Sequence, residues 1–213
     1  VLGRLSPAGA HARLSILIFH RVVPRADPLF PEPPDAAQFE RQMRWVARWF
    51  NVLPLAEAVQ RLARGDLPAR ALAITFDDGY ADNATVAAPL LRSLGLSATF
   101  FVTSGVLNGG RMWNDTVIEA VRAAAPGTLD LSAHGLGVHE IGDAMSRRAA
   151  ALQLIGAIKR DPAPRRAARV AAIAEAVGAP LPDDLMMSSA QVRGLLALGM
   201  AVGAHTVTHP ILS

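Results

Sequence analysis

The feature that most constrains this chain is the alternation of short apolar runs with segments of helical periodicity. The apolar runs have the length and composition of buried β-strands, and they comprise residues 14–19, 71–76, 98–102 and 200–204. Strands that alternate with helices pair in parallel through right-handed crossovers. The pattern therefore predicts an α/β fold, either a (β/α) barrel or a doubly wound sheet, with its chemistry at the carboxyl ends of the strands.

Helix boundaries are marked by capping residues. Asp35, with Gln38 three residues later, predicts a capping box at the start of a helix that extends to about Phe50. Gly65 and Gly95 are expected to end two further helices. Between about residues 113 and 185 the pattern changes, because helical segments follow one another without a clear strand. We therefore expect one domain, residues 1–213, with an all-helical insertion at about 113–185.

Composition excludes several classes of site. The 213 residues contain no cysteine, so disulfides, thiolate metal sites and a cysteine nucleophile are excluded. No apolar run approaches the roughly 20 residues of a membrane span, and the N-terminal sequence lacks a signal-peptide pattern. Neither observation chooses between bacterial cytoplasm and cell envelope, and nothing in the sequence predicts an oligomeric state.

The net charge of +3 comes mainly from arginine, which clusters between residues 145 and 170. Such a cluster is either a patch for an anionic partner or the solvated face of amphipathic helices. Aromatic residues do not alternate with these arginines, as they do in many single-strand nucleic-acid sites. We therefore expect no nucleic-acid partner.

Two adjacent carboxylates, Asp77 and Asp78, follow the apolar run at residues 71–76. Buried carboxylates without a partner are costly, and two side by side repel each other. A nearby cation relieves both penalties, and Gly79 permits a sharp turn at this point. One carboxylate can then bind a metal while its neighbour faces a substrate. The alternative is a simple turn in which Asp78 or Asp82 caps the next helix.

Two histidines, His205 and His209, follow the apolar run at residues 200–204. Histidines four residues apart can meet on one face of a helical turn and ligate one ion. An Asp and two His supply three protein ligands and leave a coordination position open for water or substrate, as catalytic sites require. The combination of the two strand ends therefore favours a catalytic metal site.

Residues 75–80 (Thr-Phe-Asp-Asp-Gly-Tyr) and residues 205–209 (His-Thr-Val-Thr-His) resemble the first two motifs of the polysaccharide deacetylase family. This family is also called the NodB-homology domain or carbohydrate esterase family 4. Residues 18–22, 97–103 and the run that begins at Met187 are similar to the family as well. The resemblance covers roughly residues 14–110 and 185–213.

The resemblance implies a distorted (β/α) barrel and one divalent metal, usually zinc and sometimes cobalt or nickel. Matched residue by residue, Asp77 is the general base, and Asp78, His205 and His209 bind the metal. The implied substrate is an N-acetylated glycan. The family's later motifs have no counterpart before Ser213, so we expect a barrel that is incomplete on its C-terminal side, and the activity of these residues alone stays open.

Other side chains are weaker candidates. His20, Tyr80 and Trp113 are possible substrate contacts, and Thr206 and Thr208 are possible supports of the metal ligands. Two alternative functions stay open. One is hydrolysis of another C–N bond, such as that of a cyclic imide or ureide. The other is a non-catalytic carbohydrate-binding or assembly module on the same fold.

Overall fold

A computed structural model describes residues 6–210, and these fall into two compact units. Unit 1 contains the described residues up to Ala26, Glu32–Gly110 and those from Asp184 on; unit 2 contains Asp27–Pro31 and Arg111–Asp183. Within the described residues, no helix has the length and hydrophobicity of a transmembrane span.

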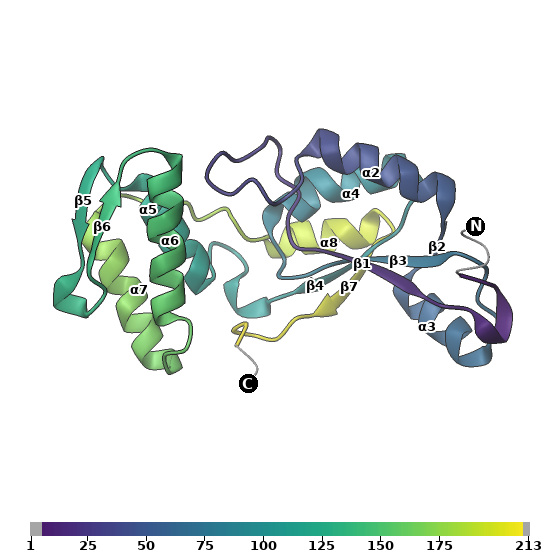
Figure 1. Cartoon of the computed structure of the whole chain (residues 1–213). Helices are drawn as coiled ribbons and strands as arrows, with labels where there is room; N and C mark the ends of the chain where they lie inside the picture. Colours follow the sequence, from purple (N-terminus) through teal and green to yellow (C-terminus); the bar gives the residue numbers. More distant parts are fainter. Residues whose placement is uncertain (1–5, 211–213) are drawn as a thin grey trace. The chain divides into compact units, whose positions relative to one another are not determined.

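Unit 1 is built on an open parallel sheet (Figure 1). Its strands follow the order β1 (Ser15–Phe19), β3 (Ala71–Phe76), β4 (Thr99–Val102) and β7 (Ala201–Ala204), and a short β2 (Asn51–Val52) pairs with the start of β3. All of these pairs are parallel. The four predicted strands and the α/β fold class are therefore confirmed, although the sheet does not close into a barrel within the described residues.

The register of the sheet aligns the ends of its strands. Phe19 pairs with Phe76, Phe76 with Phe100, and Val102 with Ala204. The residues that follow β3, β4 and β7 therefore emerge at the same carboxyl edge. This is the edge at which the strand pattern predicted the chemistry.

Helices of unit 1 pack on the sheet through one apolar cluster. They are α2 (Ala36–Trp49), α4 (Ala88–Ser93) and α8 (Ser189–Ala197), whereas α3 (Leu55–Arg64) packs on a smaller cluster near the start of β3. Phe39, Phe76 and Phe100 are buried in the larger cluster, and the stacked rings of Phe76 and Phe100 are 4.7 Å apart between centroids. Such pairs stabilise a core by about 1 kcal/mol beyond their burial.

Capping chemistry fixes two helix starts in unit 1. Asp35 and Gln38 form the predicted capping box at α2, and Ser188 with Gln191 forms another at α8. The helix expected to end at Gly95 differs at its start, because Asn83–Ala87 forms a short π-helix before α4. The Asp82 side chain does not cap this π-helix.

Unit 2 combines three helices with a β-hairpin (Figure 1). The helices are α5 (Trp113–Ala123), α6 (Ala144–Ile158) and α7 (Ala163–Val177), and the hairpin pairs β5 (Gly127–Asp130) with β6 (Val138–Ile141). The expectation of an all-helical insertion is therefore wrong. Each strand is only four residues long and buries alternate side chains, such as His139 and Ile141, so the sequence has no continuous apolar run there. Short 3-10 turns comprise Gly9–His11, Ser104–Val106 and Ser132–His134.

The arginine cluster is used inside unit 2. Arg147 donates hydrogen bonds to the carbonyls of Val121, Ala124 and Gly142, at 2.7–3.0 Å. Arg169 pairs with Asp161 at 3.1 Å. The guanidinium groups of Arg148 and Arg166 lie over the rings of Phe30 and Trp113. These arginines therefore serve the packing of unit 2, rather than forming a purely solvated face.

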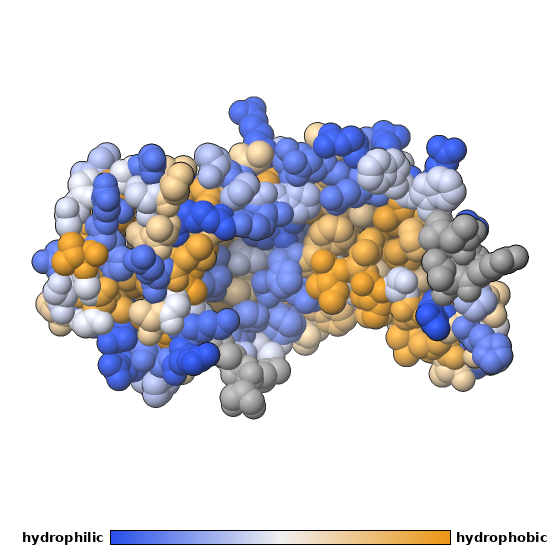
Figure 2. Space-filling view, in the orientation of Figure 1, coloured by the Kyte–Doolittle hydropathy of each residue, from blue (hydrophilic) through white to orange (hydrophobic). Residues whose placement is uncertain are grey.

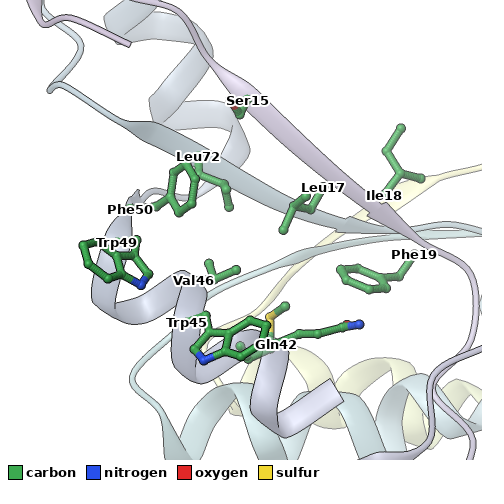
Figure 3. Close-up of a pocket in the computed structure, with 11 residues that line it drawn as sticks. Ser15, Leu17, Ile18, Phe19, Gln42, Trp45, Val46, Trp49, Phe50 and Leu72 are labelled. Carbon is green, nitrogen blue, oxygen red and sulfur yellow. The ribbon is translucent and has the colours of Figure 1, made fainter. Parts of the chain in front are cut away.

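An apolar groove of 780 Å³ lies in unit 1 between β1 and α2 (Figure 3). Ile18 of β1 and Trp45 and Trp49 of α2 contribute exposed side chains to it. The space-filling view shows apolar surface along β1, below the mainly hydrophilic outer face of α2 (Figure 2). None of the predicted metal ligands lines this groove.

Candidate metal centre

The turn after β3 directs the Asp78 side chain into the protein. The Asp77 amide donates to the carbonyl of Phe19 at 2.9 Å, so Asp77 still belongs to the edge of the sheet. Asp78 and Gly79 then both adopt positive φ angles, +78° and +89°. At Gly79 a Cβ would lie 2.8 Å from Cγ1 of Val102, so only glycine fits against β4 without a shift.

Asp78 is buried, with 6 % of its surface exposed, and its Oδ1 has no hydrogen-bond partner. A buried carboxylate oxygen without a donor costs free energy unless a cation balances it. Nε2 of His209 lies 3.3 Å and Nε2 of His205 lies 3.5 Å from this oxygen. The unsatisfied oxygen therefore faces the two predicted imidazole ligands.

The loop after β7 brings the two histidines together. Their ring centroids are 5.2 Å apart. We expected a helical turn, but the loop is not helical, because Thr206 and His209 have positive φ angles of 64° and 49°. The Thr206 hydroxyl stabilises this shape by accepting a hydrogen bond from the His209 amide at 2.9 Å. The two histidines thus come together as their spacing indicated, but through a different backbone shape.

The three side chains form a group that could hold a metal ion. One ligand atom from each of Asp78, His205 and His209 lies within 4.8 Å of the others. Two ligands bound at about 2.1 Å to a tetrahedral ion stand about 3.4 Å apart, which agrees with the distances of 3.3 and 3.5 Å from Asp78. Nitrogen and carboxylate donors suit zinc and similar divalent ions. The residues present therefore fit the implied metal.

The remaining candidate residues belong to several different elements. Asp77 is half-buried at the same edge, and His20 is exposed where β1 ends. Tyr80 is buried, with the guanidinium of Arg21 at 4.6 Å from its ring centroid. Trp113 lies in unit 2 at the start of α5. Thr208 is exposed in the loop that carries the two histidines. The roles predicted for these side chains stay predictions.

Asp82 is buried and forms an ion pair with the partly exposed Arg21 that the sequence did not predict. Its Oδ2 accepts a hydrogen bond from Nε of Arg21 at 2.8 Å, and its Oδ1 accepts one from the Val22 amide at 3.3 Å. Burial raises the pKa of Asp82, although the charge and hydrogen bond of Arg21 act in the opposite direction. The neighbouring Asn83 donates to the His20 carbonyl at 3.0 Å. Together these contacts attach the segment after β1 to the turn that carries Asp78.

Comparison with known proteins connects this site to one family. The profile of the family described as "Polysaccharide deacetylase" matches residues 64–153, which include Asp77 and Asp78 and end before His205. A protein of Bacillus subtilis (strain 168) named "Putative polysaccharide deacetylase YxkH" is 33% identical over 93 residues. The resemblance to the polysaccharide deacetylase family is therefore confirmed for the part of the chain that carries the two aspartates.

The similarity to YxkH covers 43% of this chain and 32% of that protein, so the chain spans about a third of that relative's length. A solved structure, that of the Streptococcus pyogenes deacetylase PplD in complex with acetate, has the same fold. The TM-score is 0.51 at 16% identity, over 92% of this chain and 57% of that chain. This structural comparison shows a shared fold.

Proposed function

We propose that this chain provides the metal-binding part of an enzyme that removes N-acetyl groups from amino-sugar polysaccharides or oligosaccharides. The observation that carries the proposal is the buried, unpaired Oδ1 of Asp78, which two imidazoles face at 3.3 and 3.5 Å. The match of residues 64–153 to the polysaccharide deacetylase family supports the type of reaction.

In this proposal Asp78, His205 and His209 hold one divalent metal, zinc in the first place and cobalt or nickel as alternatives. Such an ion supplies a Lewis acid and an activated water. Three protein ligands would leave a coordination position open, and the histidines are partly exposed, so a substrate could approach from solvent.

Asp77 is the proposed general base. It directly precedes Asp78 at the carboxyl edge of the sheet, and it is half-buried rather than closed off. Its carboxylate takes a proton from the water that attacks the acetamide carbonyl, and the proton then passes to the departing amine. The products are acetate and a free amino group on the sugar. His20, Tyr80 and Trp113 stay proposed substrate contacts.

The test is acetate release from an N-acetylated glucosamine oligomer by zinc-loaded protein, with Asp77→Asn as the variant. We expect the variant to keep its metal and to lose about 100-fold to 10,000-fold in kcat, since it lacks the base. Oligomer binding that ignores both a chelator and Asp77→Asn, without acetate release, would instead identify a carbohydrate-binding module. Ring opening of a cyclic imide without acetate release would identify the other C–N hydrolase.

A further inference from the structure

Thr103, the residue that follows β4, connects the two halves of the candidate metal centre. It is fully buried, at 0 % exposure. Its amide donates a hydrogen bond to the carbonyl of Asp78 at 3.1 Å, and its hydroxyl donates one to the carbonyl of His205 at 3.0 Å. One side chain and its own backbone therefore hold the backbones of two proposed ligands, which lie 127 positions apart in the sequence numbering from Asp78 to His205.

The next two residues extend this contact toward His209. The Ser104 amide donates to the carbonyl of Thr206 at 3.2 Å, and the Gly105 amide donates to that of Val207 at 2.9 Å. At Gly105 a Cβ would lie 2.3 Å from the Val207 carbonyl oxygen, so a side chain cannot fit there without a shift. Residues 103–105 thus form a backbone template along which the histidine loop lies.

The proposed ligands need such a template, because the backbone that carries them is strained. Asp78, Thr206 and His209 all have positive φ angles, which residues with a Cβ rarely adopt. Conformations of this kind persist only where surrounding contacts over-determine them. Among the contacts described, those of Thr103 are the ones that reach Asp78 and His205 at once.

We propose that Thr103 is a positioning residue of the metal centre, which sets the separation between the Asp78 carboxylate and the two imidazoles. The inference rests on the proposed function, because it presupposes that these side chains bind a metal. It assigns Thr103 no contact with the metal or with a substrate. Its hydroxyl acts through the His205 backbone, and its amide acts through the Asp78 backbone.

The experiment compares Thr103→Val, Thr103→Ser and Thr75→Val in the full chain. Valine keeps the shape of threonine and removes the hydroxyl, whereas serine keeps the hydroxyl and removes the methyl group. Thr75→Val is the matched control, because Thr75 is also buried in the sheet and its hydroxyl donates to the carbonyl of Leu17 at 3.3 Å, in the β1–β3 pair. The readouts are the Kd for zinc, the absorption spectrum of cobalt-loaded protein, and the denaturation midpoint of metal-free protein.

We expect Thr103→Val to weaken zinc binding by about 10-fold to 100-fold, as the loss of outer supports of metal ligands does elsewhere. Its cobalt spectrum should differ from that of the wild type. Thr103→Ser should stay within about threefold of the wild-type Kd, and Thr75→Val should match the wild type, even where both valine variants lower the denaturation midpoint equally.

Zinc binding by Thr103→Val that equals that of Thr75→Val would overturn the inference and leave the metal centre intact. Weaker binding by Thr103→Ser than by Thr103→Val would also overturn it, because packing rather than the hydroxyl would then be decisive. Absence of zinc binding by the wild-type chain would refute the proposed function itself, and the inference with it.

Discussion

The two units use their polar groups in different ways. In unit 2 several arginine side chains satisfy the unit's own backbone and carboxylates: Arg147 reaches several carbonyls, Arg169 pairs with Asp161, and Arg122 pairs with Asp27. In unit 1 the carboxyl edge of the sheet leaves a buried oxygen of Asp78 unsatisfied beside two partly exposed histidines. Asp78 and His209 have positive φ angles, as does Thr206 next to His205.

The comparison distinguishes charged side chains that stabilise the fold from charged side chains that are available to bind a ligand. An arginine-rich sequence suggests a patch for an anionic partner, but in unit 2 these arginines have internal partners. The site of unit 1 has few charges, but these are held in strained backbone next to an unpaired oxygen. Strain together with an unsatisfied polar group is the more informative sign of function.

The largest expected effect is that of Gly105→Ala on metal binding. The added Cβ would lie 2.3 Å from the Val207 carbonyl oxygen, so residue 105 and the histidine loop must shift relative to each other. We expect zinc affinity to fall on the order of 100-fold, as measured by titration calorimetry. Gly194→Ala is the control, because a Cβ there meets no atom within 4 Å and lies in helix α8. It should bind zinc normally and raise the free energy of unfolding by about 0.5–1 kcal/mol. Normal zinc binding by Gly105→Ala would contradict the template.

The second prediction concerns Arg147→Met in unit 2. The substitution keeps an apolar stem but leaves the carbonyls of Val121, Ala124 and Gly142 without their charged donor. We expect the free energy of unfolding to fall by about 2–3 kcal/mol, with zinc affinity unchanged. Arg165→Met should change stability by less than about 0.5 kcal/mol, because the Arg165 side chain is 62% exposed in its pair with Asp161. Equal losses of unfolding free energy in the two variants, measured in denaturant melts, would show that the hydrogen bonds of Arg147 do not stabilise unit 2.

The smallest effect is the pH dependence of the Asp27–Arg122 pair, in which the closest nitrogen and oxygen are 2.6 Å apart. Burial alone would raise the pKa of Asp27, but the hydrogen bond and charge of Arg122 and the Leu29 amide outweigh it and lower that pKa. The pair therefore stabilises the fold above the unfolded-state pKa of about 4, and its contribution disappears as the pH falls through the lower folded-state value.

Because the pair is partly exposed, we expect Asp27→Asn to cost only about 0.5–1 kcal/mol at pH 7. The difference from the wild type should vanish at about pH 2, which denaturant melts at the two pH values can measure. A difference that persists or grows in acid would show that Asp27 acts through packing rather than charge.

Much of unit 1 could be predicted from the sequence, because its signals are local. Buried parallel strands appear as continuous apolar runs, and the capping box at Asp35 and Gln38 is a pattern of adjacent residues. The carboxyl edge follows from parallel pairing, so the grouping of Asp78 with His205 and His209 was predictable before the structure.

The features that the sequence did not predict depend on contacts between residues that are distant in the sequence. The hairpin β5–β6 has short strands whose alternate side chains are exposed, so only pairing reveals it. The loop shape at Thr206 and His209 requires positive φ at residues other than glycine, which no local pattern specifies. No local sequence pattern marks Thr103. Its role is visible only in the folded sheet, where β4 lies between β3 and β7 and Thr103 contacts the turns that follow these two strands.

The central claim is that Asp78, His205 and His209 together hold one divalent ion. Its most direct test is elemental analysis of zinc-loaded, desalted protein for the wild type and the variants Asp78→Asn, His205→Ala and Asp77→Asn. We predict about one zinc per chain for the wild type and for Asp77→Asn, and less than about 0.1 for the other two. A wild type without zinc, or an Asp78→Asn variant that keeps it, would contradict the account.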